Sequence, residues 1–585
     1  MQGTQSFNFG SLYTNLVKMY QNVTTNYLKN FSGYHNDNRD ITTTYLEFFN
    51  KLVINPSEIA KVSSFYLNYL QQQQILLKNL ILDSKNQDLS ELDSPKVDKR
   101  FSDAEWSKHP YFNFLKQNYL LLEKLALQII NKVEVDDKTR KKLDFYSEQY
   151  MSAFSPSNFL FTNPEVIKLA LETNGKSLWD GFNNLVQDLE KGKISQTDES
   201  AFVVGENLAI TSGSVVFENE LIQLIQYTPF TKKVFDTPLL IVPPWINKYY
   251  VLDLQPKNSF VNYLVEKGIT VFMISWRNPK PTTGNFTFDD YVAKGVLKAI
   301  ETSVIISGVK KINTLGYCLG GTLLSIVSSI LSTNQKENPI ASATFLASMI
   351  DFTDIGPMGD IIDRALISKL ERGELMHEGF LNGADMETAF NLIRPNDLIW
   401  NYVVNNYLKG IKPTAFDVMY WTNDNANLPA NMYVYYMRNM ILENKLSTKN
   451  ALTINNTSID IGKIKFPVFV IGLKDDTISP AITAFTTTEL VSGTVEFILG
   501  DSGHVMGAIN HPSKNKYGYW LNGTLGKGFE EWKKTSQHFE GSWWTPWIEK
   551  LLKLSGKEIT APLTAGNERF KAIEPAPGSY VKEKC

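Results

Sequence analysis

The sequence predicts an α/β domain built on a parallel sheet and preceded by a mostly helical segment. Before residue 197 the candidate segments are long and amphipathic, whereas beyond it short apolar runs alternate with helical stretches. Within the second part, residues 314–323 read T-L-G-Y-C-L-G-G-T-L. This G-x-C-x-G pattern is typical of a sharp turn between a strand and a helix.

The length and amino-acid composition are typical of a large globular protein. A chain of 585 residues is too long for one simple core, which indicates two or more domains. The net charge of -3 gives no reason to expect a nucleic-acid partner. No run approaches the roughly 18 to 20 apolar residues of a membrane helix, so we expect a soluble protein without a transmembrane segment. Only two cysteines occur, which fits a reducing compartment such as the cytoplasm.

The first part contains amphipathic stretches that predict three helices, at residues 57–82, 111–132 and 163–190. It carries no catalytic motif. A polar, glycine-containing stretch at 190–198 reads as a linker. We therefore predict a mostly helical N-terminal domain at 1–196 and a catalytic domain at 197–585.

The second part contains six apolar runs that predict strands. Strands buried on both faces of a parallel sheet run continuously apolar, as these mostly do. They lie at residues 238–242, 270–275, 312–315, 343–347, 467–472 and 495–499. The interval between the fourth and fifth strands is far longer than one crossover helix requires. We therefore predict an inserted cap at about 352–464, of the kind that covers the mouth of a site.

Cys318 lies at the predicted turn between a strand at 311–315 and a helix at 321–331. Small neighbours, Gly316 and Gly320, let the backbone of such a strained turn close without a clash at Cβ. The positive end of a helix dipole favours the thiolate form of a cysteine, which is the nucleophile. The alternative is a buried structural cysteine. Together with the predicted parallel sheet, the turn predicts an α/β-hydrolase fold with an inserted cap.

A cysteine nucleophile needs a base and a group that orients the base, and in this fold they follow in the order nucleophile, acid, histidine. The strand at 467–472 is followed by Asp475 and Asp476, and the next strand is followed by His504 in a glycine-bounded loop. Both positions are filled, which predicts a triad. Periodicity does not choose between the two adjacent aspartates. His511, which precedes a proline, is expected to be exposed.

An oxyanion hole in this fold uses the amide of the residue after the nucleophile, here Leu319, and a second amide from an earlier loop. The loop at 243–248 reads P-P-W-I-N-K. Prolines have no N–H, so Trp245 or Ile246 supplies the second amide, with Ile246 as the candidate. The histidines and Cys318 show no metal-ligand spacing, and we expect neither a metal nor a cofactor.

Several stretches together resemble polyhydroxyalkanoate synthases. They span about 202–585 and include 243–254, 275–279, 316–321, 394–402, 476–480, 502–504 and 575–584. The length of the chain is similar to that of class I, the single-subunit type that acts on short 3-hydroxyacyl-CoA thioesters. One departure is Trp245, where relatives often have cysteine, so a two-thiol route of chain growth would need Cys318 of a partner subunit.

The resemblance implies roles for the site residues. Cys318 would carry the acyl group, His504 would act as its base, and Asp476, rather than Asp475, would be the third member. It also implies a homodimer that works in the cytoplasm at the surface of polyester granules and binds 3-hydroxyacyl-CoA and the growing polyester chain.

The predicted activity is polymerisation of short-chain 3-hydroxyacyl-CoA with release of CoA. Two alternatives remain at the level of sequence. A cysteine-type hydrolase, such as an esterase or depolymerase, would use the same triad. A granule-coating protein with a vestigial site would use none of it.

Overall fold

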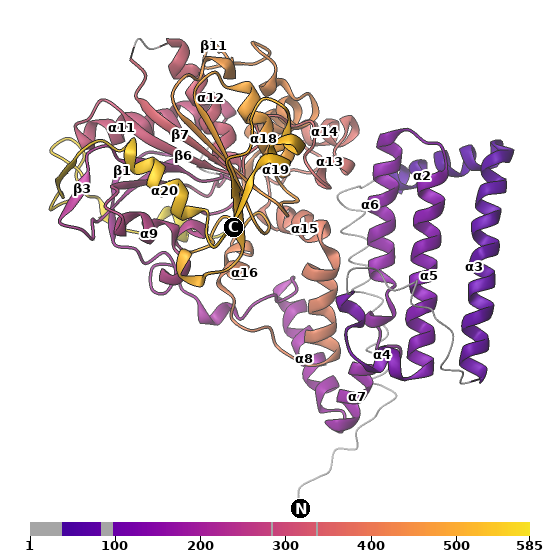
Figure 1. The fold of residues 1–585 in the computed structure, drawn as a ribbon. Helices are drawn as coiled ribbons and strands as arrows, with labels where there is room; N and C mark the ends of the chain where they lie inside the picture. The colour runs from indigo at the N-terminus through magenta and orange to yellow at the C-terminus, as the bar shows by residue number, and fades with distance from the viewer. Residues whose placement is uncertain (1–37, 83–97, 282–284, 335–336) are drawn as a thin grey trace, which may run out of the picture. The chain divides into compact units, whose positions relative to one another are not determined.

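The computed structural model describes residues 38–82, 98–281, 285–334 and 337–585 (Figure 1). The chain divides into two compact units, which are described separately. Unit 1 comprises Met1–Asp198 and Thr388–Thr414, and unit 2 comprises Glu199–Glu387 and Ala415–Cys585. The division after Asp198 lies two residues from the domain boundary that the linker at 190–198 predicts.

Unit 1 is built from helices. Helices α3 (Pro56–Leu82), α5 (Pro110–Lys132) and α6 (Asp137–Ala153) lie side by side, and α2 (Asn38–Ile54) runs across one end of them and contacts α3 and α6 (Figure 1). The helices predicted at 57–82 and 111–132 are therefore present. The helix predicted at 163–190 is instead two helices, α7 (Pro164–Glu172) and α8 (Lys176–Lys191). Gly175 separates them with φ 81°, a left-handed conformation that interrupts a right-handed helix.

Residues 388–414, which the sequence places in the predicted cap, group with the helical unit instead. Within unit 1, Asn184 Nδ2 donates to the Asn406 carbonyl (3.0 Å), and the Tyr407 hydroxyl donates to Asp188 Oδ2 (2.7 Å). Gly181 permits this contact, because a Cβ there would lie 2.0 Å from the Tyr407 carbonyl oxygen. These pairings join residues more than 200 positions apart, which local sequence patterns cannot reveal.

Unit 2 is organised around an 11-stranded sheet with the order β15-β14-β13-β12-β7-β6-β4-β5-β2-β1-β17. All six predicted strands are present and run parallel at its centre. They are β4 (Leu239–Val242), β5 (Val271–Trp276), β6 (Ile312–Tyr317), β7 (Ile340–Leu346), β12 (Val468–Leu473) and β13 (Val495–Gly500). Because parallel strands end at the same edge, their carboxyl ends bring the predicted site residues to one side of the sheet.

Antiparallel strands that the sequence analysis does not predict extend the sheet at both edges. They are β1 (Gly213–Glu218), β2 (Ile222–Tyr227) and β17 (Glu574–Pro575) on one side, and β14 (Gly518–Leu521) and β15 (Gln537–Glu540) on the other. Helices α9 (Phe260–Glu266) and α20 (Trp544–Lys553) cover one face, and α12 (Leu319–Asn334) and α18 (Ala481–Leu490) cover the other (Figure 1). Phe260 packs on Trp544 with ring centroids 4.8 Å apart, which joins α9 to α20.

Asp253 is a buried carboxyl in the core of unit 2, with 1% of the residue exposed. Its Oδ1 accepts hydrogen bonds from the Thr211 hydroxyl (2.5 Å) and the Ser259 hydroxyl (2.6 Å). Burial raises the pKa of Asp253 to about 6, although these hydrogen bonds oppose the rise. The folded state thus binds a proton here more tightly than an unfolded chain does. This stabilising contribution is fully present below about pH 4 and is lost as the pH rises through about 6.

We expect Asp253→Asn to raise the stability of unit 2 at pH 7.5 and to leave it nearly unchanged at pH 4. The neutral amide keeps an oxygen for Thr211 and Ser259 and removes the buried charge. The gain is roughly 2 to 3 kcal/mol at most, since one pKa unit corresponds to about 1.4 kcal/mol. Thermal unfolding at a series of pH values measures it, with Asp475→Asn, at an exposed position, as the control. A gain that is the same at both pH values would contradict this account.

Candidate active site

Cys318 lies between the end of β6 at Tyr317 and the start of α12 at Leu319. Its φ is 53°, in the left-handed region, and its N–H donates to the Leu346 carbonyl (2.9 Å). This conformation is uncommon for a non-glycine residue, and here it reverses the chain between the strand and the helix. The predicted turn is therefore formed, with Cys318 at its tip.

The flanking glycines are required by close backbone approaches. A Cβ on Gly316 would lie 2.4 Å from Gly321 Cα, and one on Gly320 would lie 2.0 Å from the Val242 carbonyl oxygen. The second approach holds the start of α12 directly against the end of β4. The turn and the loop that follows β4 are consequently neighbours.

Asp476 follows β12, and its side chain is fully buried. Its Oδ1 accepts hydrogen bonds from the amides of Ile478 and Ser479, each at 2.8 Å. Its Oδ2 lies 2.7 Å from His504 Nδ1. Asp475 is exposed. The structure thus brings Asp476, and not its neighbour, to His504.

His504 also lies close enough to the side chain of Cys318 to interact with it electrostatically. Burial of the imidazole tends to lower the pKa of His504, but the charges of Asp476 and Cys318, together with the hydrogen bond to Asp476, raise it well above its usual value. The three predicted side chains therefore form one connected chain of contacts. Its electrostatics favour a protonated His504 beside the sulfur.

Tyr317 is a further residue of the site that sequence reasoning missed. Its ring stacks on the His504 imidazole, with centroids 5.4 Å apart and planes at 27°, and its hydroxyl donates to the His504 carbonyl (3.2 Å). The only available signal was its place beside Cys318 in the motif. Nothing local could indicate a contact with a loop 187 residues away.

The two candidate oxyanion amides lie on neighbouring segments, at Leu319 and in the loop at 243–248. In the described part of the chain, neither the Leu319 amide nor the Ile246 amide donates to another backbone group outside regular helix and strand bonding. The Trp245 ring is buried and packs on Tyr436 of the cap, with centroids 5.7 Å apart. Burial raises the pKa of Tyr436 well above its usual value, with a further contribution from the charge of Cys318. The cap thus packs an aromatic side chain on the loop that follows β4.

We expect Asp476→Asn to lower the catalytic rate strongly and Asp475→Asn to leave it nearly unchanged. The asparagine can still accept from Ile478 and Ser479, but it cannot supply the negative charge that stabilises protonated His504. In enzymes with a related triad, loss of the orienting carboxylate costs about 10⁴-fold. Steady-state turnover by the two purified variants tests this. Equal losses in both variants would contradict the assignment.

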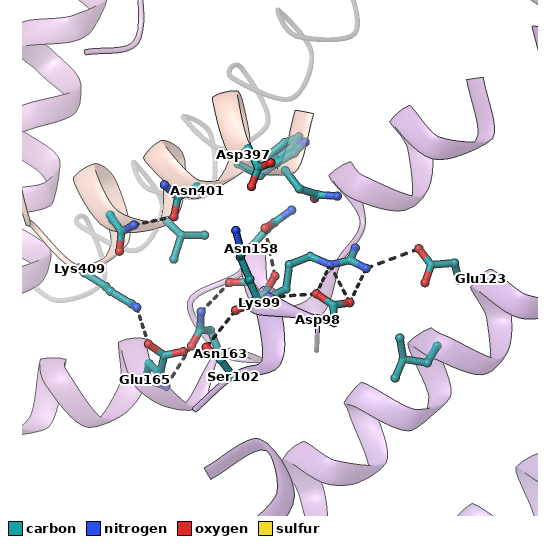
Figure 2. Close-up of a pocket in the computed structure, with 17 residues that line it drawn as sticks. Asp98, Lys99, Ser102, Glu123, Asn158, Asn163, Glu165, Asp397, Asn401 and Lys409 are labelled. Atoms are coloured by element: carbon teal, nitrogen blue, oxygen red, sulfur yellow. Dashed lines mark hydrogen bonds and ion pairs between the residues drawn. The ribbon is translucent and has the colours of Figure 1, made fainter. Parts of the chain in front are cut away.

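A separate pocket of about 750 Å³ lies within unit 1 (Figure 2). Five of its charged side chains pair with one another: Arg100 contacts Asp98 (2.7 Å) and Glu123 (3.5 Å), and Lys409 pairs with Glu165. The pocket contains none of the predicted catalytic residues.

Among the residues that the structure describes, no group of three or more His, Cys, Asp or Glu side chains is arranged to hold a metal ion. No helix in the same ranges is long and apolar enough to span a membrane. His511, expected to be exposed, is instead half-buried between Tyr263 and Trp544, with ring centroids 5.7 and 5.5 Å away.

The central parallel sheet, the nucleophile turn and the acid and histidine after successive strands define an α/β hydrolase. The sequence model of the alpha/beta hydrolase fold family accordingly matches residues 237–508. The model described as poly-beta-hydroxybutyrate polymerase (PhaC) N-terminus matches residues 97–264.

Relatives extend this match over most of the chain. The poly(3-hydroxyalkanoate) polymerase subunit PhaC of Cupriavidus necator is 42% identical over 90% of this chain and 90% of its own length. The poly(3-hydroxyalkanoate) polymerase of Methylorubrum extorquens is 41% identical over 84% of this chain and 82% of its own. The chain belongs to the poly(3-hydroxyalkanoate) polymerase family.

Proposed function

We propose that the chain polymerises short-chain 3-hydroxyacyl-CoA into polyester through an acyl thioester on Cys318. One observation carries the proposal. A chain with 42% identity to a poly(3-hydroxyalkanoate) polymerase has a cysteine at the nucleophile turn, in contact with a histidine that pairs with a buried aspartate. Each of these groups has a role in acyl transfer.

In the first step the Cys318 sulfur attacks the carbonyl carbon of 3-hydroxyacyl-CoA. The bond between that carbon and the CoA sulfur breaks, and protonated His504 gives its proton to the departing CoA thiolate. The amides of Leu319 and Ile246 donate to the oxyanion of the tetrahedral intermediate. The product is an acyl group held on Cys318 as a thioester.

In the second step the hydroxyl of another 3-hydroxyacyl unit, or of the chain end, attacks the acyl carbon on Cys318. His504 takes the hydroxyl proton, the carbon-sulfur bond breaks, and the thiolate is restored. The reaction exchanges a thioester for an oxoester, which is downhill. A serine in place of Cys318 would hold an oxoester already and would lose this driving force. Water must be excluded, because it would release a free acid.

The proposal extends to a cytoplasmic homodimer at the granule surface. Its support in the described residues is an apolar stripe on α3, where large side chains lie at helical spacing and are 38 to 78% exposed. They are Ile59, Tyr66, Leu67, Leu70, Leu77 and Ile81. Such a surface is suited to a second protein copy or an apolar polymer.

Product analysis tests the proposed activity. Purified protein incubated with 3-hydroxybutyryl-CoA should form ester-linked polymer. It should release one molecule of CoA for each monomer that enters the polymer. Free 3-hydroxybutyrate in place of polymer would identify a cysteine hydrolase. Binding to polyester granules without any CoA release would identify a coating protein.

A further inference from the structure

Residues 577–585, here named the strap, cross two loops at the carboxyl ends of β4 and β5. The Tyr249 hydroxyl donates to the Pro577 carbonyl (3.3 Å). The Arg277 guanidinium lies over the Tyr580 ring, 4.7 Å from its centroid, and pairs with Glu583 (3.5 Å). The strap therefore packs on the side of the sheet that carries the candidate site.

At the centre of these contacts is a buried ion pair between Lys248 and Asp424, with side chains 5% and 3% exposed. Lys248 Nζ donates to Asp424 Oδ1 (2.8 Å) and to the main-chain carbonyl of Glu583 (2.8 Å). Lys584 Nζ donates to the same Asp424 oxygen (2.7 Å). A buried ammonium needs several acceptors. The strap supplies one of them and adds a second cation to the carboxylate.

The loop at 243–248 and the residues after it are also tied to the cap. Trp421 Nε1 donates to the Lys248 carbonyl (2.7 Å), and Asn247 forms a β-bridge with Asn425. The Tyr250 hydroxyl donates to Asp424 Oδ2 (2.8 Å). The segment that begins at Asn247 is thus held between the cap and the strap.

The other end of this loop is held by the nucleophile turn, through the contact of Gly320 with Val242 described above. Ile246 lies between the two anchors, two residues before Lys248. An oxyanion donor is effective only within hydrogen-bond distance of the developing charge. The direction of the Ile246 amide therefore depends on both anchors.

We propose that the strap is a positioning element of the active site. The Glu583 carbonyl and the Lys584 ammonium hold the ion pair, and the ion pair fixes the loop that presents Ile246. This inference rests on the proposed function, because the oxyanion role of Ile246 belongs to it.

Two variants test the role in catalysis: a chain truncated after Lys582, and Lys248→Met in the full chain. The oxyanion contact of Ile246 is made only in the transition state, and loss of such an interaction lowers kcat and kcat/KM equally. In both variants kcat should therefore fall, while KM for 3-hydroxybutyryl-CoA stays close to that of the wild type. The fall should be about 10- to 100-fold, somewhat less than for removal of an oxyanion donor. The control is Lys582→Met, which changes an exposed strap residue outside the ion pair.

Cys585 reports directly on whether the strap stays in place. Its Sγ lies 3.1 Å from the Asn425 carbonyl and 3.6 Å from Asn278 Nδ2. In a Cys318→Ser background it is the only thiol left. Adding Lys248→Met to that background should accelerate maleimide labelling of Cys585, because the strap loses its anchor.

Alkylation of Cys318 by iodoacetamide, followed by peptide mass analysis, shows whether the catalytic cysteine itself is intact. In Lys248→Met it should proceed at the wild-type rate. The inference is overturned if both variants keep wild-type kcat, or if labelling of Cys585 is unchanged. It is also overturned if Lys248→Met loses Cys318 alkylation and thermal stability together, since that indicates general unfolding. Absence of CoA release from the wild type would instead contradict the proposed function.

Discussion

Cys318→Ala protein should release CoA from 3-hydroxybutyryl-CoA on the order of 10³-fold more slowly than the wild type, or slower still. Removal of a covalent nucleophile abolishes the acyl-enzyme route. Loss of any one residue of a catalytic triad lowers the catalytic rate by several orders of magnitude. The fold should survive, because alanine removes one atom from a partly exposed side chain. A spectrophotometric thiol assay of released CoA measures the rate, and thermal unfolding checks the fold.

The matched control is Cys585→Ala, which removes the second and last thiol of the chain. It should keep polymerising, because Cys585 lies against Asn425 and Asn278 and has no role in the proposed chemistry. The serine variant Cys318→Ser should also be severely impaired, since its acyl-enzyme would be an oxoester. If Cys318→Ala released CoA at the wild-type rate, a residue other than Cys318 would have to carry the acyl group.

His504→Gln should lower kcat by about 10²- to 10⁴-fold, the contribution of a positioned general base. Glutamine is close in size and can still donate to Asp476, but it cannot accept and return a proton. The variant should also slow alkylation of Cys318 by iodoacetamide at pH 7, because glutamine, unlike histidine, cannot accept the proton of the thiol. Rates of CoA release and of alkylation, measured on the same preparation, separate the two effects.

His511→Gln is the control for this change. His511 is a half-buried histidine in unit 2 whose Nδ1 contacts the Ser513 hydroxyl (2.7 Å), away from the triad contacts. Its replacement should leave CoA release and Cys318 alkylation unaffected. Comparable losses in both variants would mean that His504 acts through packing rather than through its proton.

The sequence predicts the central strands of unit 2 well, because the signals that predict them are local. A strand buried on both faces is a continuous apolar run, and Cys318, Asp476 and His504 each follow such a run. The choice between Asp475 and Asp476 needed either the family resemblance or the structure. Adjacent loop residues point in different directions, and in the folded chain Asp476 is buried whereas Asp475 is exposed.

Other features depend on contacts between distant segments and could not be predicted. The edge strands alternate weakly and pair with residues far away, as β1 does with β17. The grouping of residues 388–414 with unit 1 rests on pairings such as that of Tyr407 with Asp188. The same holds for Tyr317 on His504, and for the strap on Lys248. The polar residues that make these long-range contacts follow no sequence periodicity, so the sequence does not indicate which residues they contact.

The measurement that tests the central claim most directly is the trapping of the acyl-enzyme. Protein mixed briefly with 3-hydroxybutyryl-CoA is quenched in acid, digested and analysed by mass spectrometry. The account predicts 3-hydroxybutyryl groups, single or oligomeric, on the peptide that contains Cys318, and their removal by neutral hydroxylamine, which cleaves thioesters. Release of CoA and formation of polymer with an unmodified Cys318 peptide, and with the acyl group on another residue, would contradict it.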